Sequence, residues 1–150
     1  MKLYLVQHGI ALKEDVDPKK GLSREGKIQT LRVLAFLGAK GFNVDVLWHS
    51  NKQRAIDTAK VITDNIQVGE VSTRNDLSPL SEVGDLPLQI TNLNKNLMIV
   101  SHLPFLNRLL SKLILGVDVY ELILFRNSCI VCLDYKDRWR IEWIVNPDII

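Results

Sequence analysis

Three short apolar runs, each followed directly by a segment with helical spacing, constrain the fold of this chain more than any other feature. Residues 3–6, 44–48 and 97–100 are apolar at most positions, as in central strands that are covered on both faces of a sheet. Strands that alternate with helices form a mostly parallel sheet. The pattern therefore predicts an α/β protein built as a three-layer α/β/α sandwich.

The segments that follow these strands carry the signals of helix starts. Ser23 can cap the first helix through its hydroxyl. Ser50 and Gln53 fit the capping-box pattern, which would place Arg54 in the first turn of the second helix. Pro104 suits the first turn of a third helix, because proline needs no backbone N–H partner there.

The C-terminal part of the chain has a different pattern. Residues 138–143 alternate polar and apolar side chains, as in a strand with one face in water. We expect this strand to pair antiparallel with residues 128–134 through a turn near 136–137. A short strand at 68–73 and a loop at 77–84 complete the prediction. The result is one domain, residues 1–150, with a mostly parallel sheet and an antiparallel C-terminal edge.

Charge and hydropathy exclude several classes of partner. The net charge of +2 is small and the basic residues are dispersed, which argues against a nucleic-acid groove. The apolar run at the N-terminus ends after residue 6, too early for a signal peptide or a membrane span. We therefore expect a cytoplasmic protein with neither nucleic acid nor a membrane as its partner.

Cys129 and Cys132 have the C-x-x-C spacing of redox and metal sites. They fall in a predicted strand, where residues three apart point to opposite faces of the sheet. Redox pairs of this spacing owe their reactivity to a helix N-terminus. We interpret the two thiols as core residues.

All three histidines of the chain lie at strand ends. His8, His49 and His102 each fall within two residues of the end of a predicted strand. In parallel sheets the ligand site is at the carboxyl ends of the strands, so these histidines are expected to converge. Arg54 would lie at a helix N-terminus, where backbone N–H groups attract anions. Imidazole, guanidinium and helix N-terminus together indicate a phosphate site.

Four segments of the sequence, spread over nearly the whole chain, form a recognisable series. They are LVQHG at residues 5–9, LSREG at 22–26, SNKQRAIDTA at 50–59 and VSHLP at 100–104. The first is similar to a strand that ends in Arg-His-Gly, the second to a Leu-Thr/Ser-x-x-Gly helix start, the third to Ser-Pro-x-x-Arg-Ala-x-x-Thr-Ala, and the fourth to Val-Ser/Gly-His-x-Pro. In this order they resemble the histidine phosphatase superfamily and in particular its short SixA-type phosphohistidine phosphatases.

The resemblance implies a phosphoglycerate-mutase-like fold and a reaction through a phosphorylated histidine. His8 would attack phosphorus in line and later be regenerated by water, as a neutral imidazole can near pH 7. Arg54 and a protonated or donor-form His102 would hold the phosphoryl oxygens. The resemblance implies neither a metal nor another cofactor.

The predicted substrate-binding ring includes Gln7, Gly9, Lys20 and Ser101. Gln7 stands where the family has arginine, and it offers neutral donors in place of a charged fork. Hydrogen bonds to charged groups contribute about 1.5–3 kcal/mol, so this exchange could lower affinity or rate roughly ten- to hundredfold. Lys20, or Lys19 after a small shift, would replace a second basic residue of the SixA pocket, although each is equally well explained as a solvated loop lysine.

Glu82 and Asp85 are the candidate acids for the leaving group. If the substrate is a phosphohistidine, its imidazole is a far less basic leaving group than an alkoxide, so strong acid catalysis matters less. The chain also has little length for an inserted segment that would close over a small substrate. We therefore expect an open site suited to a protein surface.

These observations leave three functional hypotheses. The leading one is a metal-independent phosphatase for phosphohistidine on a signalling phosphotransfer protein, which would also accept a small phosphoramidate or phosphate ester. The second is a catalytically impaired module that binds a phosphorylated partner, and it rests on Gln7. The third is a zinc site formed by all three histidines, although His49 is better explained as a residue that covers a helix start. Asp45 and Asp57 are interpreted as structural charges.

Overall fold

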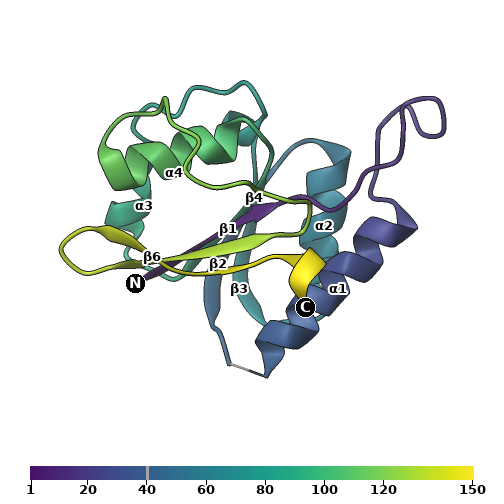
Figure 1. The fold of residues 1–150 in the computed structure, drawn as a ribbon, viewed down its shortest axis with the longest axis horizontal. Coiled ribbons are helices and arrows are strands. Elements are labelled where there is room, and N and C mark those ends of the chain that lie inside the picture. Colours follow the sequence, from purple (N-terminus) through teal and green to yellow (C-terminus); the bar gives the residue numbers. More distant parts are fainter. Residues whose placement is uncertain (40) are drawn as a thin grey trace.

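The structure, a computed structural model, describes residues 1–39 and 41–150. Within these residues it forms one six-stranded sheet with helices on both faces (Figure 1). The strands are β1 (Lys2–Gln7), β2 (Val44–Ser50), β3 (Val68–Arg74), β4 (Leu97–Ser101), β5 (Ile130–Tyr135) and β6 (Trp139–Val145). The helices are α1 (Arg24–Gly38), α2 (Gln53–Thr63), α3 (Leu86–Leu93) and α4 (Phe105–Leu115), with short 3₁₀ turns η1 (Asn75–Leu77) and η2 (Pro147–Ile149).

The sheet is mostly parallel, as predicted. Its strand order is β3-β2-β4-β1-β5-β6, and the pairs β2–β3, β2–β4 and β1–β4 are parallel. β5 runs antiparallel to both β1 and β6, which gives the expected antiparallel C-terminal edge. The carboxyl ends of β1, β2 and β4 therefore lie at the same edge of the sheet.

Two hydrophobic layers pack the sheet between its helices. Leu3 and Leu5 of β1 face the layer shared with α3 and α4, whereas Tyr4 and Val6 face the layer shared with α1 and α2. Figure 1 shows these two helix pairs on opposite sides of the sheet. The three-layer α/β/α sandwich is thereby confirmed.

The cysteines are buried on opposite sides of this sheet, as expected. Cys129 packs in the layer of α3 and α4, and Cys132 in the layer of α1 and α2. Both thiols are free. Burial raises the pKa of Cys132 to about 12, so this thiol is inert near neutral pH.

The predicted cap of the second helix is wrong, although the helix itself is correct. Ser50 is the last residue of β2, where it pairs with Arg74 of β3, and α2 begins only at Gln53. The Gln53 amide donates to Asp57, 2.7 Å away, instead of reaching back to Ser50. Pairing with β3 extends the strand further than local propensity indicates. Arg54 nevertheless lies in the first turn of α2.

Two other helix starts differ in their agreement with the prediction. Ser23 caps α1 as expected, because its hydroxyl accepts a hydrogen bond from Gly26 N at 3.0 Å. Pro104 lies one residue before α4 instead of inside its first turn. Helix α3 was not predicted, since its eight residues carry only a short apolar pattern in which Leu86 and Ile90 are the buried positions.

No helix in residues 1–39 and 41–150 is long and apolar enough to cross a membrane.

Candidate active site

The backbone of His8 is fixed from both neighbours of β1. His8 N donates to the carbonyl of Ser101 at the end of β4, 3.0 Å away. On the other side, the side-chain amide of Asn127 donates to the His8 carbonyl at 2.9 Å. These contacts hold the residue at the carboxyl edge of the sheet, directly after β1 ends at Gln7.

The imidazole of His8 is held in one tautomer. Its Nδ1 lies 2.7 Å from the carbonyl oxygen of Gly9, and a carbonyl only accepts, so Nδ1 carries the proton. The lone pair is therefore on Nε2, where it accepts a hydrogen bond from Arg54 Nε at 3.2 Å. A neutral imidazole with its Nε2 lone pair beside a cation can act as a nucleophile toward an anion that the cation binds.

Burial and charge keep His8 neutral. Burial and, to a smaller extent, the charge of Arg54 lower the pKa of His8 to about 4, against the opposing effect of the hydrogen bond to Gly9. The ring is consequently unprotonated throughout the physiological range. It needs no separate base to become a nucleophile.

Thr58 couples Arg54 to the loop after His8. Its hydroxyl donates to the Arg54 carbonyl at 2.7 Å and accepts from Gly9 N at 3.0 Å. Gly9 is also tightly enclosed, since a Cβ there would lie 2.5 Å from Leu22 Cδ1 and 3.1 Å from the Gly26 carbonyl oxygen. Close packing of α1 and α2 thus sets the distance between the His8 loop and Arg54.

His102 lies beside His8 at the end of β4. The two ring centroids are 4.9 Å apart, and His102 is only 1% exposed. Burial, together with the neighbouring side chains of His8, Arg54 and Lys52, lowers the pKa of His102 to about 3. Of the two forms that the sequence allowed, the neutral donor form is favoured over the protonated one.

The two nitrogens of His102 have different surroundings. Nε2 lies 2.8 Å from the hydroxyl of Ser50. Nδ1 is buried and has no hydrogen-bond partner among residues 1–39 and 41–150. A buried polar atom without a partner is costly, so Nδ1 is available to a ligand.

Three residues of the predicted binding ring take positions that the sequence did not specify. Ser101 is fully buried and donates its hydroxyl proton to the Leu77 carbonyl at 2.7 Å, which anchors the loop after β3. The amide oxygen of Gln7 is buried and has no hydrogen-bond partner in the described part of the chain. Lys20 lies on the arm between β1 and α1, drawn in purple in Figure 1, with its ammonium 4.0 Å from Glu14. Among the described residues no contact joins Lys20 to His8.

The two candidate acids are not joined to the histidines by any contact among the described residues. Glu82 has a side chain that is 86% exposed, and it pairs with Arg108 at 3.1 Å. Asp85 precedes α3 and accepts a hydrogen bond from the Gln89 amide at 2.9 Å. Their role as acids stays a prediction.

His49 does not join the other two histidines. Its Nδ1 lies 3.0 Å from the Ser50 carbonyl and its Nε2 lies 3.4 Å from Thr73 Oγ1. In the part of the chain that the structure describes, no three His, Cys, Asp or Glu side chains are grouped to hold a metal ion. The geometry therefore does not support the hypothesis of a three-histidine zinc site.

Sequence reasoning missed three residues of the site. Lys52 adds a positive charge that reaches His102, Ser50 contacts the His102 ring, and Asn127 holds the His8 backbone. Ser50 could have been found, because it opens the segment that also contains Arg54. Asn127 had no signal, since it meets His8 across a separation of 119 residues.

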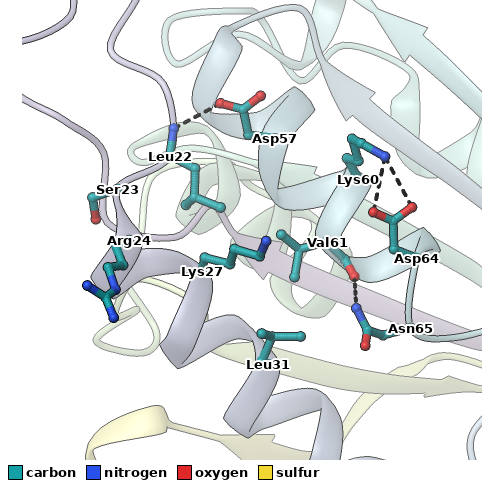
Figure 2. Close-up of a pocket in the computed structure, with 10 residues that line it drawn as sticks. All are labelled: Leu22, Ser23, Arg24, Lys27, Leu31, Asp57, Lys60, Val61, Asp64 and Asn65. Atoms are coloured by element: carbon teal, nitrogen blue, oxygen red, sulfur yellow. Dashed lines mark hydrogen bonds and ion pairs between the residues drawn. The ribbon is translucent and has the colours of Figure 1, made fainter.

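A hollow of about 580 Å³ lies between α1 and α2 (Figure 2). Lys27 and Lys60 border it, above a floor that includes Leu31. Neither His8 nor His102 lines this hollow. The histidine cluster is a separate site at the edge of the sheet.

Comparison with known proteins gives matches in structure only. No protein-family model and no curated protein matches the sequence. The chain is similar to the solved structure of the protein histidine phosphatase SixA complexed with tungstate, with a TM-score of 0.88, 20% identity, and coverage of 99% of this chain and 98% of that chain. It is also similar to the proposed phosphohistidine phosphatase SixA of Agrobacterium tumefaciens, with a TM-score of 0.79, 20% identity and coverage of 97% of both chains.

A third match extends the comparison beyond SixA. A mycobacterial glucosyl-3-phosphoglycerate phosphatase, solved with VO3, gives a TM-score of 0.72 at 15% identity, with 95% of this chain and 97% of that chain covered. At such identities the likeness establishes the fold. The chain thus has the phosphoglycerate-mutase-like fold of these phosphatases along its whole length, as the resemblance in the sequence implied.

Proposed function

We propose that this chain is a phosphatase that removes the phosphoryl group from phosphohistidine through a phosphorylated His8. One observation carries the proposal: the unprotonated Nε2 of His8 lies 3.2 Å from Arg54 Nε, and the Nδ1 proton is held by the Gly9 carbonyl. The likeness in fold to SixA structures, one of them with bound tungstate, supports this choice of chemistry.

The first step is transfer of the phosphoryl group between two imidazoles. The incoming phosphoryl group displaces the hydrogen bond from Arg54 Nε to His8 Nε2. The freed Nε2 lone pair forms the new P–N bond as the P–N bond of the substrate breaks, and the electron pair of that bond leaves with the substrate imidazole. A substrate ring protonated on its other nitrogen departs as a neutral imidazole. In the second step water attacks phosphorus, the bond to His8 breaks, and inorganic phosphate is released.

Positive charge and oriented donors would stabilise the transferred group. The two terminal amino groups of Arg54 have no protein partner among the described residues, so they are free to bind phosphoryl oxygens as a fork. Lys52 and the N-terminus of α2 add positive potential. Gln7 would contribute a neutral amide where the family has a charge. Lys20 would act only if the arm that carries it moves toward the site.

The proposed physiological substrate is a signalling phosphotransfer protein that carries an exposed phosphohistidine. Glu82 and Asp85 remain the proposed acids for the leaving group. Neither is required for a protonated phosphohistidine, because its leaving group is already neutral.

Release of phosphate from phosphoramidate and from a phosphorylated phosphotransfer domain tests the proposal. We expect release by the native chain, formation of an acid-labile phosphoenzyme, and loss of both in His8→Ala. His49→Asn is the matched control, since it replaces a histidine at the end of a neighbouring strand outside the cluster. Equal release by the native and His8→Ala proteins would contradict the proposed intermediate. Binding of phosphate without any release would instead support a binding module.

A further inference from the structure

We infer that Ser50 is a positioning residue that fixes the tautomer of His102, so that His102 presents an Nδ1–H donor to the phosphoryl group. This inference deepens the proposed function and rests on it for the identity of the ligand. The tautomer itself is a property of the free protein. It can therefore be tested separately from activity.

The hydroxyl of Ser50 has few partners, and they determine its orientation. Ser50 ends β2 and is 0% exposed. Its Oγ accepts a hydrogen bond from Lys52 N at 3.3 Å and lies 2.8 Å from His102 Nε2. An N–H group can only donate, so Lys52 cannot receive the hydroxyl proton. His102 Nε2 is the acceptor that remains among the contacts of this side chain.

The alternative tautomer leaves two groups in unfavourable positions. If His102 carried its proton on Nε2, that N–H would donate to Ser50 and the buried hydroxyl proton would have no acceptor. Nδ1 would then be a bare lone pair. A buried donor without a partner is destabilising, and a lone pair on Nδ1 would repel the oxygens of a phosphoryl group.

Donation from Ser50 to Nε2 satisfies both partners of the bond. The His102 proton is then on Nδ1, which is buried and has no partner among the described residues. The ring centroid of His102 lies 4.9 Å from the ring centroid of His8. His8 is the residue whose Nε2 would carry the phosphoryl group. The unpartnered Nδ1–H is thus the donor that a phosphoryl oxygen would satisfy.

Ser50 and Gly9 consequently play equivalent parts for the two histidines. The Gly9 carbonyl places the His8 proton on Nδ1 and leaves Nε2 bare. The Ser50 hydroxyl places the His102 proton on Nδ1 by occupying Nε2. One ring becomes a nucleophile and the other a donor, although both are neutral.

Nitrogen NMR of ¹⁵N-labelled protein at neutral pH tests the inference, because protonated and bare ring nitrogens have well-separated shifts. The His102 signal is assigned by its absence from His102→Gln. We expect the Nδ1–H tautomer in the native chain, a mixture or the Nε2–H tautomer in Ser50→Ala, and the native tautomer in Ser50→Thr, which retains the hydroxyl. Ser111→Ala is the matched control, because Ser111 is equally buried but its hydroxyl donates to Val117.

Kinetics with phosphoramidate provide the second measurement. Loss of one donor to a charged oxygen corresponds to about a tenfold decrease in kcat. We expect that decrease in Ser50→Ala, with a smaller change in KM, and recovery in Ser50→Thr. An Nε2–H tautomer in the native chain, or the same tautomer in the native and Ser50→Ala proteins, overturns the inference. A native chain with the Nδ1–H tautomer but no phosphatase activity would refute the proposed function alone.

Discussion

Arg54 donates from its Nε to the Nε2 lone pair of His8 across 3.2 Å. The group proposed to bind phosphate and the atom proposed to attack phosphorus are therefore in direct contact before any ligand arrives. Such preorganisation keeps the cation beside the nucleophile. A phosphoryl group takes the place of this hydrogen bond, because the single lone pair of Nε2 cannot accept from Arg54 and attack phosphorus at once. The planar, forked guanidinium can then donate to two phosphoryl oxygens.

Replacing Arg54 by lysine is expected to lower kcat/KM for phosphoramidate about 100-fold, although the charge is retained. Lysine is a point charge that cannot bind two phosphoryl oxygens as a planar fork. Steady-state phosphate release measures the effect. Arg24→Lys is the control, because Arg24 is an exposed arginine on α1. Equal losses in the two variants would show that the fork geometry is unimportant.

On the acid side of the pH–rate profile, we expect the rate to fall at a pH well below 6.5, the ordinary pKa of histidine. Burial and Arg54 lower the pKa of His8 to about 4, so its nucleophilic form persists as pH falls from 8 to about 5. The profile of kcat/KM for phosphoramidate, which reports ionisations of the free protein, should be flat in that window and should fall only near pH 4. A limb near pH 6.5 would contradict this prediction.

Stability should also decrease in acid because of the same two histidines. Their pKa values, about 4 for His8 and about 3 for His102, lie below the unfolded value of 6.5. The unfolded chain therefore binds more protons below about pH 6.5, and the stabilising contribution is progressively lost as pH falls toward the folded pKa values. Urea unfolding between pH 7 and 4 should show a smaller decrease for His102→Gln than for the native chain. Parallel curves would argue against this assignment.

Thr58→Val should weaken both stability and activity. The variant leaves the Gly9 N–H without the acceptor it now has at 3.0 Å and removes the tie to the Arg54 carbonyl. Loss of a buried partner costs about 1–3 kcal/mol, and kcat/KM should fall with it as the His8 loop loosens. Thr63→Val on the same helix is the control, since Thr63 bonds only to Lys60 within α2. Urea denaturation and phosphate release distinguish the two variants.

Gln7→Arg is expected to raise kcat/KM for phosphoramidate about tenfold, because a charged donor contacts phosphate more strongly than an amide. Gln67→Arg makes the same change at an exposed position at the other end of the sheet. An increase from almost no activity would indicate that the native chain is mainly a binding module. No increase would show that Gln7 does not face the phosphoryl group.

The sequence by itself determined the central strands, their mostly parallel arrangement and the meeting of His8 with His102, although not the separation of His49 from them. This was predictable because the apolar runs at 3–6 and 97–100 indicate buried strands from neighbouring residues alone. Parallel strands also bring their carboxyl ends to the same edge of the sheet. Arg54 followed from its place at a helix start. These features depend on spacing along the chain, which the sequence contains in full.

Tertiary structure alone decided which other polar groups contact the two histidines and which do not. Ser50 has the pattern of a helix cap, yet pairing with β3 keeps it in β2 and brings its hydroxyl to His102. Asn127 reaches His8 from the far end of the chain, and Glu82 turns to Arg108. A hydrogen bond extends only about 3 Å, so the partner of a polar group depends on how segments distant in the sequence pack together. A local sequence pattern contains no information about that packing.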